Sequence, residues 1–160
     1  LLPYAVGETV VALREDGRRA FTYETGDTVV ALAAGPQRLA VATVGGSVTV
    51  LDAQGEIVGE ETFAGEIDAV RVDRLRVVVQ RGRTLEARGG SLQRTWLLPA
   101  RAQLQDLGSN RIVYVAAGRA YRIAVGTGEQ RQLGAGTLAQ AEGAQLFVAS
   151  GRRVSLTRFR

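Results

Sequence analysis

The fold is decided by one stretch that recurs four times along the chain: RLAVAT (38–43), RLRVVV (74–79), RIVYVA (111–116) and QLFVAS (145–150). The starts of these segments are separated by 36, 37 and 34 residues. Each segment is rich in β-branched and apolar residues, and each is followed by a glycine turn, at Gly45-Gly46, Gly82, Gly118 and Gly151. A glycine between two such runs supplies the positive φ of a tight hairpin, so each segment is predicted to be a strand that enters a hairpin.

A second set of turns follows about ten residues after the first. Its members are Asp16-Gly17, Gln54-Gly55, Gly89-Gly90 and Thr127-Gly128, which are separated by 38, 35 and 38 residues. The repeating unit therefore contains four short strands. In the first complete unit they are predicted at 28–33, 38–43, 47–52 and 56–62. The first strands of later units are predicted near 67–72, 102–106 and 136–141, and the last unit stops after a third strand at 154–159.

This repeat predicts an all-β fold of β-propeller type. Four antiparallel strands every ~35–45 residues, joined by short turns, are typical of propeller blades. No segment carries the 3.6-residue apolar stripe of a helix, so almost no helix is expected. The chain is interpreted as a single domain, 1–160, of about four to five blades. Its divisions are a partial blade at 1–26, blades at 27–64, 65–100 and 101–135, and a partial blade at 136–160.

Neither end of the chain holds a whole blade. Two interpretations stay open: an arc or incomplete ring completed by further sequence or by a partner chain, or a five-bladed ring closed by pairing the two ends. Pro3 falls inside the second strand of the first unit. Because proline has no N–H to donate, residues 1–6 are expected to form either an exposed edge strand or an irregular lead-in. Exposed edges also predict that the isolated chain oligomerises or aggregates.

Three segments resemble known propeller repeats. VTVLDAQGEIV (48–58) and YRIAVGTGEQRQL (121–133) resemble the blades of bacterial PQQ-like and WD-repeat-like propellers, and REDGRRAFTY (14–23) resembles a TolB-like repeat. In quinone-binding members of the first kind, a tryptophan follows the turn glycine by a few residues. Here the stretch after Gly55 carries Glu60 and Glu61 instead. The resemblance therefore implies the fold and no quinone, and Trp96 is expected to pack between blades.

The composition removes most familiar catalytic chemistry. The 160 residues include 20 Arg but no Lys, His, Cys or Met. The chain thus lacks the usual zinc ligands, the commonest general base and the P-loop lysine, and no cofactor or metal site is predicted. The same usage suggests a GC-rich bacterial genome, and a first residue other than Met suggests either a piece of a longer protein or a chain that follows a removed leader. The longest apolar run, 29–46, is interrupted at Pro36, so no membrane span is expected.

Charge is unevenly distributed along the chain. Residues 1–80 hold 7 Arg and 12 acidic residues, whereas residues 81–160 hold 13 Arg and 4 acidic residues. Because consecutive strands are antiparallel, the turn between the second and third strands lies at the same end of a blade as the link between blades. Six arginines are predicted at that end and form the candidate partner-binding face: Arg81, Arg83, Arg101, Arg119, Arg152 and Arg153. In the acidic half of the chain, the equivalent links between blades contain Asp27 and Glu66.

The function predicted from this pattern is a non-catalytic scaffold that presents one face to a protein or another anionic partner, within a larger bacterial protein. The same arginines could instead be ordinary solvated turn residues. Nucleic-acid binding is not favoured, because Tyr114, Tyr121 and Phe147 fall at expected core positions. At the opposite end, Arg38, Arg74 and Arg111 recur beside Asp73 and Asn110, which suggests packing or ion pairs between blades.

An enzyme is the alternative interpretation. An extracytoplasmic hydrolase or carbohydrate-binding propeller would need two carboxylates on facing first strands, and only Asp68 and Asp106 fall there. Adjacent acids such as Glu60 and Glu61 point to opposite faces of a strand and cannot share a proton or a metal ion. We therefore expect a binding protein rather than an enzyme.

Overall fold

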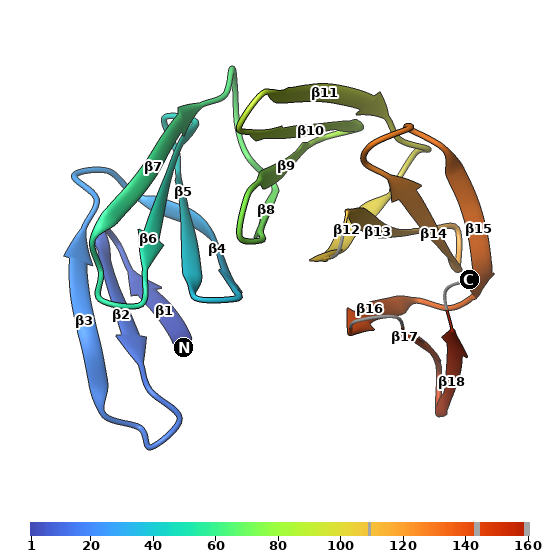
Figure 1. The fold of residues 1–160 in the computed structure, drawn as a ribbon, viewed down its shortest axis with the longest axis horizontal. Coiled ribbons are helices and arrows are strands. Elements are labelled where there is room, and N and C mark those ends of the chain that lie inside the picture. The colour runs from blue at the N-terminus through green and yellow to red at the C-terminus, as the bar shows by residue number, and fades with distance from the viewer. Residues whose placement is uncertain (109, 143–144, 159–160) are drawn as a thin grey trace. The chain divides into compact units, whose positions relative to one another are not determined.

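The computed structural model describes residues 1–108, 110–142 and 145–158 (Figure 1). This part of the chain contains eighteen β-strands in five antiparallel sheets and no helix. The structure thus confirms the predicted all-β class with propeller-type blades. Phe159, the end of the last predicted strand, lies outside the described residues. No helix in the described part is long and apolar enough to cross a membrane.

Each sheet is formed by strands that follow one another in the chain, and we number these sheets blades 1 to 5. Blade 1 contains β1 (Leu2–Val6), β2 (Thr9–Leu13) and β3 (Arg19–Glu24). Blade 2 contains β4 (Val29–Gly35), β5 (Arg38–Thr43), β6 (Ser47–Asp52) and β7 (Ile57–Thr62). Blade 3 contains β8 (Ala69–Val72), β9 (Val77–Arg81), β10 (Thr84–Gly89) and β11 (Leu92–Leu97).

The remaining strands form blades 4 and 5. Blade 4 contains β12 (Gln103–Gly108), β13 (Arg111–Ala116), β14 (Arg119–Ala124) and β15 (Gln130–Ala135). Blade 5 contains β16 (Leu138–Glu142), β17 (Gln145–Ser150) and β18 (Arg153–Arg158). The chain divides into two compact units, Leu1–Thr95 and Trp96–Arg160.

Blades 1 and 2 pack through alternate residues of their strands. Leu39 and Val41 of β5 and Leu51 of β6 are fully buried in one cluster with Val10 of β2. The intervening residues Ala40 and Ala42 point to the other face of blade 2. There they join a second cluster with apolar residues of blade 3, among them Val70, Val72, Val77 and Val79. Blade 2 is therefore buried on both faces, which explains why its central strands are almost continuously apolar.

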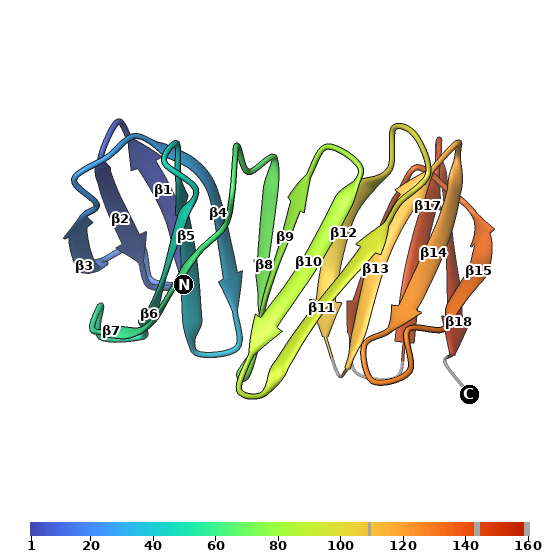
Figure 2. The ribbon, with the colours of Figure 1, turned by 90° about the horizontal axis from the view of Figure 1, so that it is seen from above.

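In blades 2 and 3, a hydrogen bond links the turn between the second and third strands to the connection that precedes the blade. The Asp27 carboxylate, just before β4, accepts a hydrogen bond from the Gly45 N–H at 2.9 Å. In the next blade, the Asp68 carboxylate accepts a hydrogen bond from the Gly82 N–H. The turn between the second and third strands therefore does share one end of the blade with the link between blades. Figure 2 shows the turns gathered at the ends of each sheet.

One strand begins later than its apolar pattern predicts. RLRVVV is predicted to be extended from residue 74, but β9 starts at Val77. The reason is a turn built by Asp73, whose Oδ1 accepts hydrogen bonds from the N–H groups of Leu75 and Arg76, both at 2.8 Å. The residue equivalent to Arg38 in blade 3 is consequently Arg76, while Arg74 lies in the turn. The predicted repetition of Arg38, Arg74 and Arg111 is corrected to Arg38, Arg76 and Arg111.

Residues 1–6 contain an edge strand rather than an irregular lead-in. β1 pairs with β2 in regular register from Leu2 to Val6, and Pro3 lies within it, opposite Ala12. Within the described residues of this sheet, β1 is the terminal strand. Proline is tolerated there because an edge strand does not use every N–H in a ladder.

Candidate functional site

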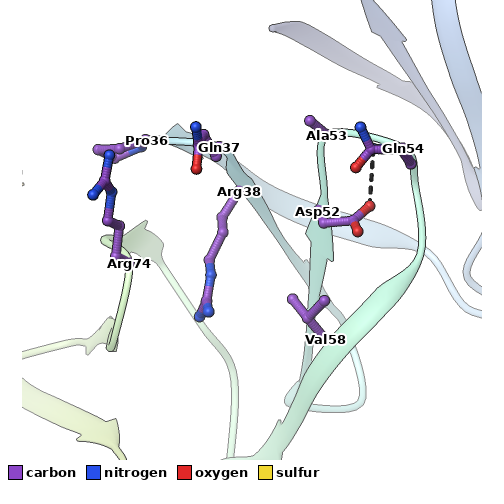
Figure 3. Close-up of a pocket in the computed structure, with 8 residues that line it drawn as sticks. All are labelled: Pro36, Gln37, Arg38, Asp52, Ala53, Gln54, Val58 and Arg74. Carbon is purple, nitrogen blue, oxygen red and sulfur yellow. Dashed lines mark hydrogen bonds between the residues drawn. The ribbon is translucent and has the colours of Figure 1, made fainter.

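The first unit contains a pocket of about 590 Å³ at one end of blades 2 and 3 (Figure 3). It is lined by the β4–β5 turn, the first residue of β5, the last residue of β6, the β6–β7 turn, one residue of β7 and the Asp73–Arg76 turn of blade 3. These residues are Pro36, Gln37, Arg38, Asp52, Ala53, Gln54, Val58 and Arg74. The pocket lies at the end of the blades opposite to the one that the sequence predicts as the partner face.

Arg38 extends through the middle of the pocket, between Arg74 on one side and Asp52 and Val58 on the other (Figure 3). Asp52 is the cross-strand neighbour of Arg38 in the β5–β6 ladder. Its Oδ1 instead accepts hydrogen bonds from the Gln54 and Glu56 N–H groups, at 2.8 and 3.0 Å. Among the described residues, no carboxylate lies within ion-pair distance of the Arg38 or Arg74 guanidinium.

The repeat-equivalent arginine of blade 3 has a carboxylate partner. Arg76 Nε lies 3.5 Å from Asp73 Oδ2, and both side chains are largely buried. In blade 2, the position of Asp73 is occupied by Gly35. Gly35 is the cross-strand partner of Arg38, and in blade 3 the Asp73 N–H donates a hydrogen bond to the carbonyl of Arg76. A Cβ at Gly35 would lie 2.2 Å from the Val72 carbonyl oxygen of blade 3. The close approach of the two blades therefore excludes a carboxylate side chain from this position.

The six arginines of the predicted partner face are divided between the two units. Arg81 and Arg83 belong to the first unit, and the other four belong to the second. Arg81 is engaged inside its own unit, because its Nη2 lies 2.8 Å from Glu86 Oε2 and its guanidinium also donates to the Ala64 carbonyl. Its Nε is buried without a hydrogen-bond partner. Arg83 is exposed in the β9–β10 turn.

The four arginines of the second unit lie at one end of blades 4 and 5, and we call them the arginine end: Arg101, Arg119, Arg152 and Arg153. Arg119 is the first residue of β14 and follows the β13–β14 turn. This turn is hydrogen-bonded to the link between the two blades, because the Gly136 N–H donates to the Gly118 carbonyl at 2.8 Å. All four side chains are exposed. Within the described residues none pairs with a carboxylate, and Arg119 donates to the neutral Gln132 at 3.1 Å.

Blades 2 and 3 are joined by an ion-pair network that the sequence pattern does not predict. Arg88 Nη2 lies 2.7 Å from Glu86 Oε1, while Arg88 Nη1 donates to the Thr62 carbonyl at 2.8 Å and lies 3.3 Å from Glu61 Oε2. The Arg88 guanidinium also lies 4.3 Å from the centroid of the Phe63 ring. Burial opposes the charged form, but hydrogen bonds to Glu86 and Glu61 raise the pKa of Arg88 above its ordinary value. The one sequence signal was the spacing of Glu86 and Arg88, which places both on one face of a strand.

The carboxylates considered for catalysis serve the backbone. The Asp68 carboxylate accepts a hydrogen bond from the Gly82 N–H, and Asp106 Oδ1 accepts one from the Leu107 N–H at 2.7 Å. Asp68 and Asp106 also belong to different units. Across residues 1–108, 110–142 and 145–158, no three acidic side chains gather as metal ligands would.

The aromatic residues differ in their placement. Tyr114 is buried, as predicted, and its ring stacks on Tyr121 at a centroid distance of 5.0 Å. Its hydroxyl donates to Gln130 Oε1 at 3.0 Å. Burial, together with the neighbouring Tyr121, raises the pKa of Tyr114 above its ordinary value. Tyr121 and Phe147, which were also predicted at core positions, are only half-buried, as is Trp96.

The outward face of blade 1 is apolar and uncovered. Leu2 and Tyr4 of β1 are 62% and 48% exposed, although Leu39 and Val41, at the same positions of blade 2, are completely buried. The strand registers establish that these positions are equivalent. Leu2 lies opposite Leu13 in the β1–β2 ladder, and Leu39 lies opposite Leu51 in the β5–β6 ladder. In blade 2 these positions are covered by blade 1. In blade 1, no described residue covers them.

Comparison with known proteins identifies the fold. No family model matches the chain, and no curated protein matches it. Several solved structures, however, superpose on this chain. BamB from Moraxella catarrhalis superposes with a TM-score of 0.64 and 14% identity over 92% of this chain and 57% of that one. Kluyveromyces lactis Hsv2 gives a TM-score of 0.69 and 12% identity, over 82% of this chain and 46% of that one.

A third solved structure is described as a propeller by name. The Myceliophthora thermophila Cps50 (Swd1) β-propeller domain superposes with a TM-score of 0.61 and 16% identity, over 92% of this chain and 58% of that domain. This chain has the β-propeller type of fold. It spans about half of the length of these three proteins, and at such low identity the likeness shows the fold alone.

Proposed function

We propose that this chain is a non-catalytic propeller module that binds a protein partner with an acidic surface, within a larger bacterial protein of the PQQ-like or WD-repeat-like kind. The observation that carries the proposal is the arginine end of the second unit. Four exposed guanidiniums there lie on turns and links of adjacent blades, and no described carboxylate neutralises them. Such a single-signed surface attracts anionic partners and speeds their association.

A protein partner fits this surface better than a nucleic acid. Proteins that bind single-stranded nucleic acids combine basic grooves with aromatic side chains on which the bases stack. In the second unit, Tyr114 is buried and its ring is already stacked on Tyr121. Arginine, by contrast, is enriched at protein interfaces because its planar fork forms paired hydrogen bonds with carboxylates.

The experiment compares two triple variants with the same change in charge. In the first, Arg119, Arg152 and Arg153 are replaced by serine. In the control, three exposed arginines elsewhere are replaced by serine: Arg14, Arg19 and Arg131. Retention on a heparin column and capture of an acidic protein partner should fall for the first variant and stay near wild type for the control. Equal behaviour of the two variants would contradict the proposal.

The uncovered face of blade 1 supports a second contact, in which a further propeller-type sheet covers it. Leu2, Tyr4, Val6 and Leu13 form this face, and their equivalents in blade 2 are covered by a sheet of the same construction. That sheet would come from a partner chain or from the rest of the protein. Replacing Leu2 and Tyr4 with threonine should reduce self-association in light scattering, whereas threonine at Leu75, which lies exposed in a turn, should not. A monodisperse monomer at every concentration would contradict a second copy of this chain as the source of that sheet.

A further inference from the structure

We infer that the pocket at the end of blades 2 and 3 is a binding site for a carboxylate group. The key observation is Arg38, a half-buried residue whose side chain extends through the pocket without an anionic partner among the described residues (Figure 3). A charged group that is partly removed from water is stabilised by a counter-charge. Arg76, at the same position of blade 3, has such a counter-charge in Asp73.

The missing counter-charge is a consequence of how the blades pack. Blade 2 carries Gly35 where blade 3 carries Asp73, and the Val72 carbonyl leaves no room for a side chain. Asp52 faces the same pocket, but its Oδ1 is held by the N–H groups of the β6–β7 turn. An anion that reaches Arg38 must therefore come from outside the blade.

The lining of the pocket selects the kind of anion. Arg38 and Arg74 contribute two positive charges and Asp52 contributes one negative charge, so the net charge of the lining is +1. A carboxylate, with a single negative charge and a planar shape, matches the guanidinium fork. A phosphate ester carries about −1.5 to −2 at neutral pH and would be repelled by Asp52.

The remaining residues suit a polar organic molecule. Gln37 and Gln54 supply amide donors and acceptors, and Pro36 and Val58 supply an apolar wall. A volume of about 590 Å³ falls within the ~300–1,000 Å³ of small-ligand sites. A free organic acid and the acidic side chain of a peptide share this chemistry, and the experiment separates them.

The test is an NMR titration that follows the Nε–H signals of the arginines. The probes are N-acetylglycine, the peptide acetyl-Gly-Glu-Gly-amide and inorganic phosphate. Both carboxylates should shift the Arg38 and Arg74 signals in a saturable way, and phosphate should bind more weakly. Tighter binding of N-acetylglycine identifies a small organic acid as the source, and tighter binding of the peptide identifies an acidic segment. Absence of saturable shifts with both carboxylates would overturn the inference, as would tighter binding of phosphate.

Three variants extend the test. Arg38→Gln should weaken carboxylate binding by about tenfold or more, because a charge-assisted hydrogen bond is lost. Arg19→Gln, an exposed arginine on β3, should leave the affinity unchanged. Asp52→Asn should tighten binding severalfold, since Asn keeps the Oδ1 acceptor of the turn but removes the negative charge. Equal affinity of the two arginine variants, or weaker binding by Asp52→Asn, would overturn the inference. The pocket belongs to the first unit, so none of these outcomes bears on the arginine end of the second.

Discussion

Glu86 Oε2 of β10 lies 2.8 Å from Arg81 Nη2 of β9, and only 7% of the Glu86 side chain is exposed. The other oxygen of the same carboxylate lies 2.7 Å from Arg88 Nη2. One buried carboxylate thus binds two guanidiniums. Arg88 in turn donates to the Thr62 carbonyl, and Arg81 donates to the Ala64 carbonyl, at the end of blade 2 and in the segment that follows it. This arrangement makes Arg81 part of the structure of the first unit.

Replacing Glu86 with glutamine should destabilise the first unit. The variant leaves two partly buried guanidiniums without their negative charge, and breaking a buried pair from one side costs about 3 kcal/mol. Urea denaturation measures the loss. The matched control is Asp16→Asn, because the Arg18–Asp16 pair spans 3.8 Å with both side chains exposed and should contribute less than about 1 kcal/mol. Equal losses in the two variants would show that the network is no more than a surface pair.

Alkaline pH should weaken the second unit through Tyr114. Burial raises the folded-state pKa of this tyrosine above its unfolded value. The stabilising effect is therefore complete below the unfolded pKa of about 10 and is lost as pH rises through the folded pKa. The chain has no Lys or Cys whose titration would overlap with that of Tyr114. Denaturation midpoints at increasing pH should fall for wild type, and Tyr114→Phe should remove most of that fall. A slope unchanged in Tyr114→Phe would contradict the assignment.

Gly35→Ala should be strongly destabilising. The new Cβ would lie 2.2 Å from the Val72 carbonyl, a backbone atom that cannot swing aside. Overpacking of this kind costs about 1–3 kcal/mol, measured by urea denaturation. Gly59→Ala is the control within the same blade, because its Cβ would meet nothing closer than Val50 at 3.9 Å. It should be neutral or stabilising by up to about 1 kcal/mol. Similar effects of the two substitutions would show that blades 2 and 3 do not approach each other closely at Gly35.

The sequence predicted the hairpins because their signals are local. Glycines at the second-to-third-strand turns have positive φ, as expected: 81° at Gly46, 56° at Gly82, 70° at Gly118 and 58° at Gly151. The start of β9 was predicted wrongly because one side chain, Asp73, holds 74–76, the first three residues of the predicted strand, in a turn. That competition depends on where a carboxylate points, which an apolar pattern does not record.

The pocket was beyond prediction for a different reason. Arg38 was identified as a recurring arginine, but its lack of a partner depends on the distance between Gly35 and Val72, which lie in different blades. The Glu86 network likewise joins residues of separate blades. Such contacts depend on how one sheet packs on the next, and the repeat period alone does not specify it.

Equivalent leucines of blades 1 and 2 differ in burial and therefore provide a matched pair of substitutions. Leu39→Ala and Leu2→Ala are the same substitution at equivalent positions of blades 2 and 1, but Leu39 is fully buried and Leu2 is 62% exposed. The first should cost about 2–5 kcal/mol in urea denaturation, because it removes core contacts and leaves a cavity. At low protein concentration, the second should cost less than about 1 kcal/mol. If a further sheet covers blade 1, the cost of Leu2→Ala should grow with protein concentration or in the presence of that sheet, as binding to the folded state adds stability by mass action. A cost as large as that of Leu39→Ala in a dilute monomer would show that blade 1 is already covered within the chain.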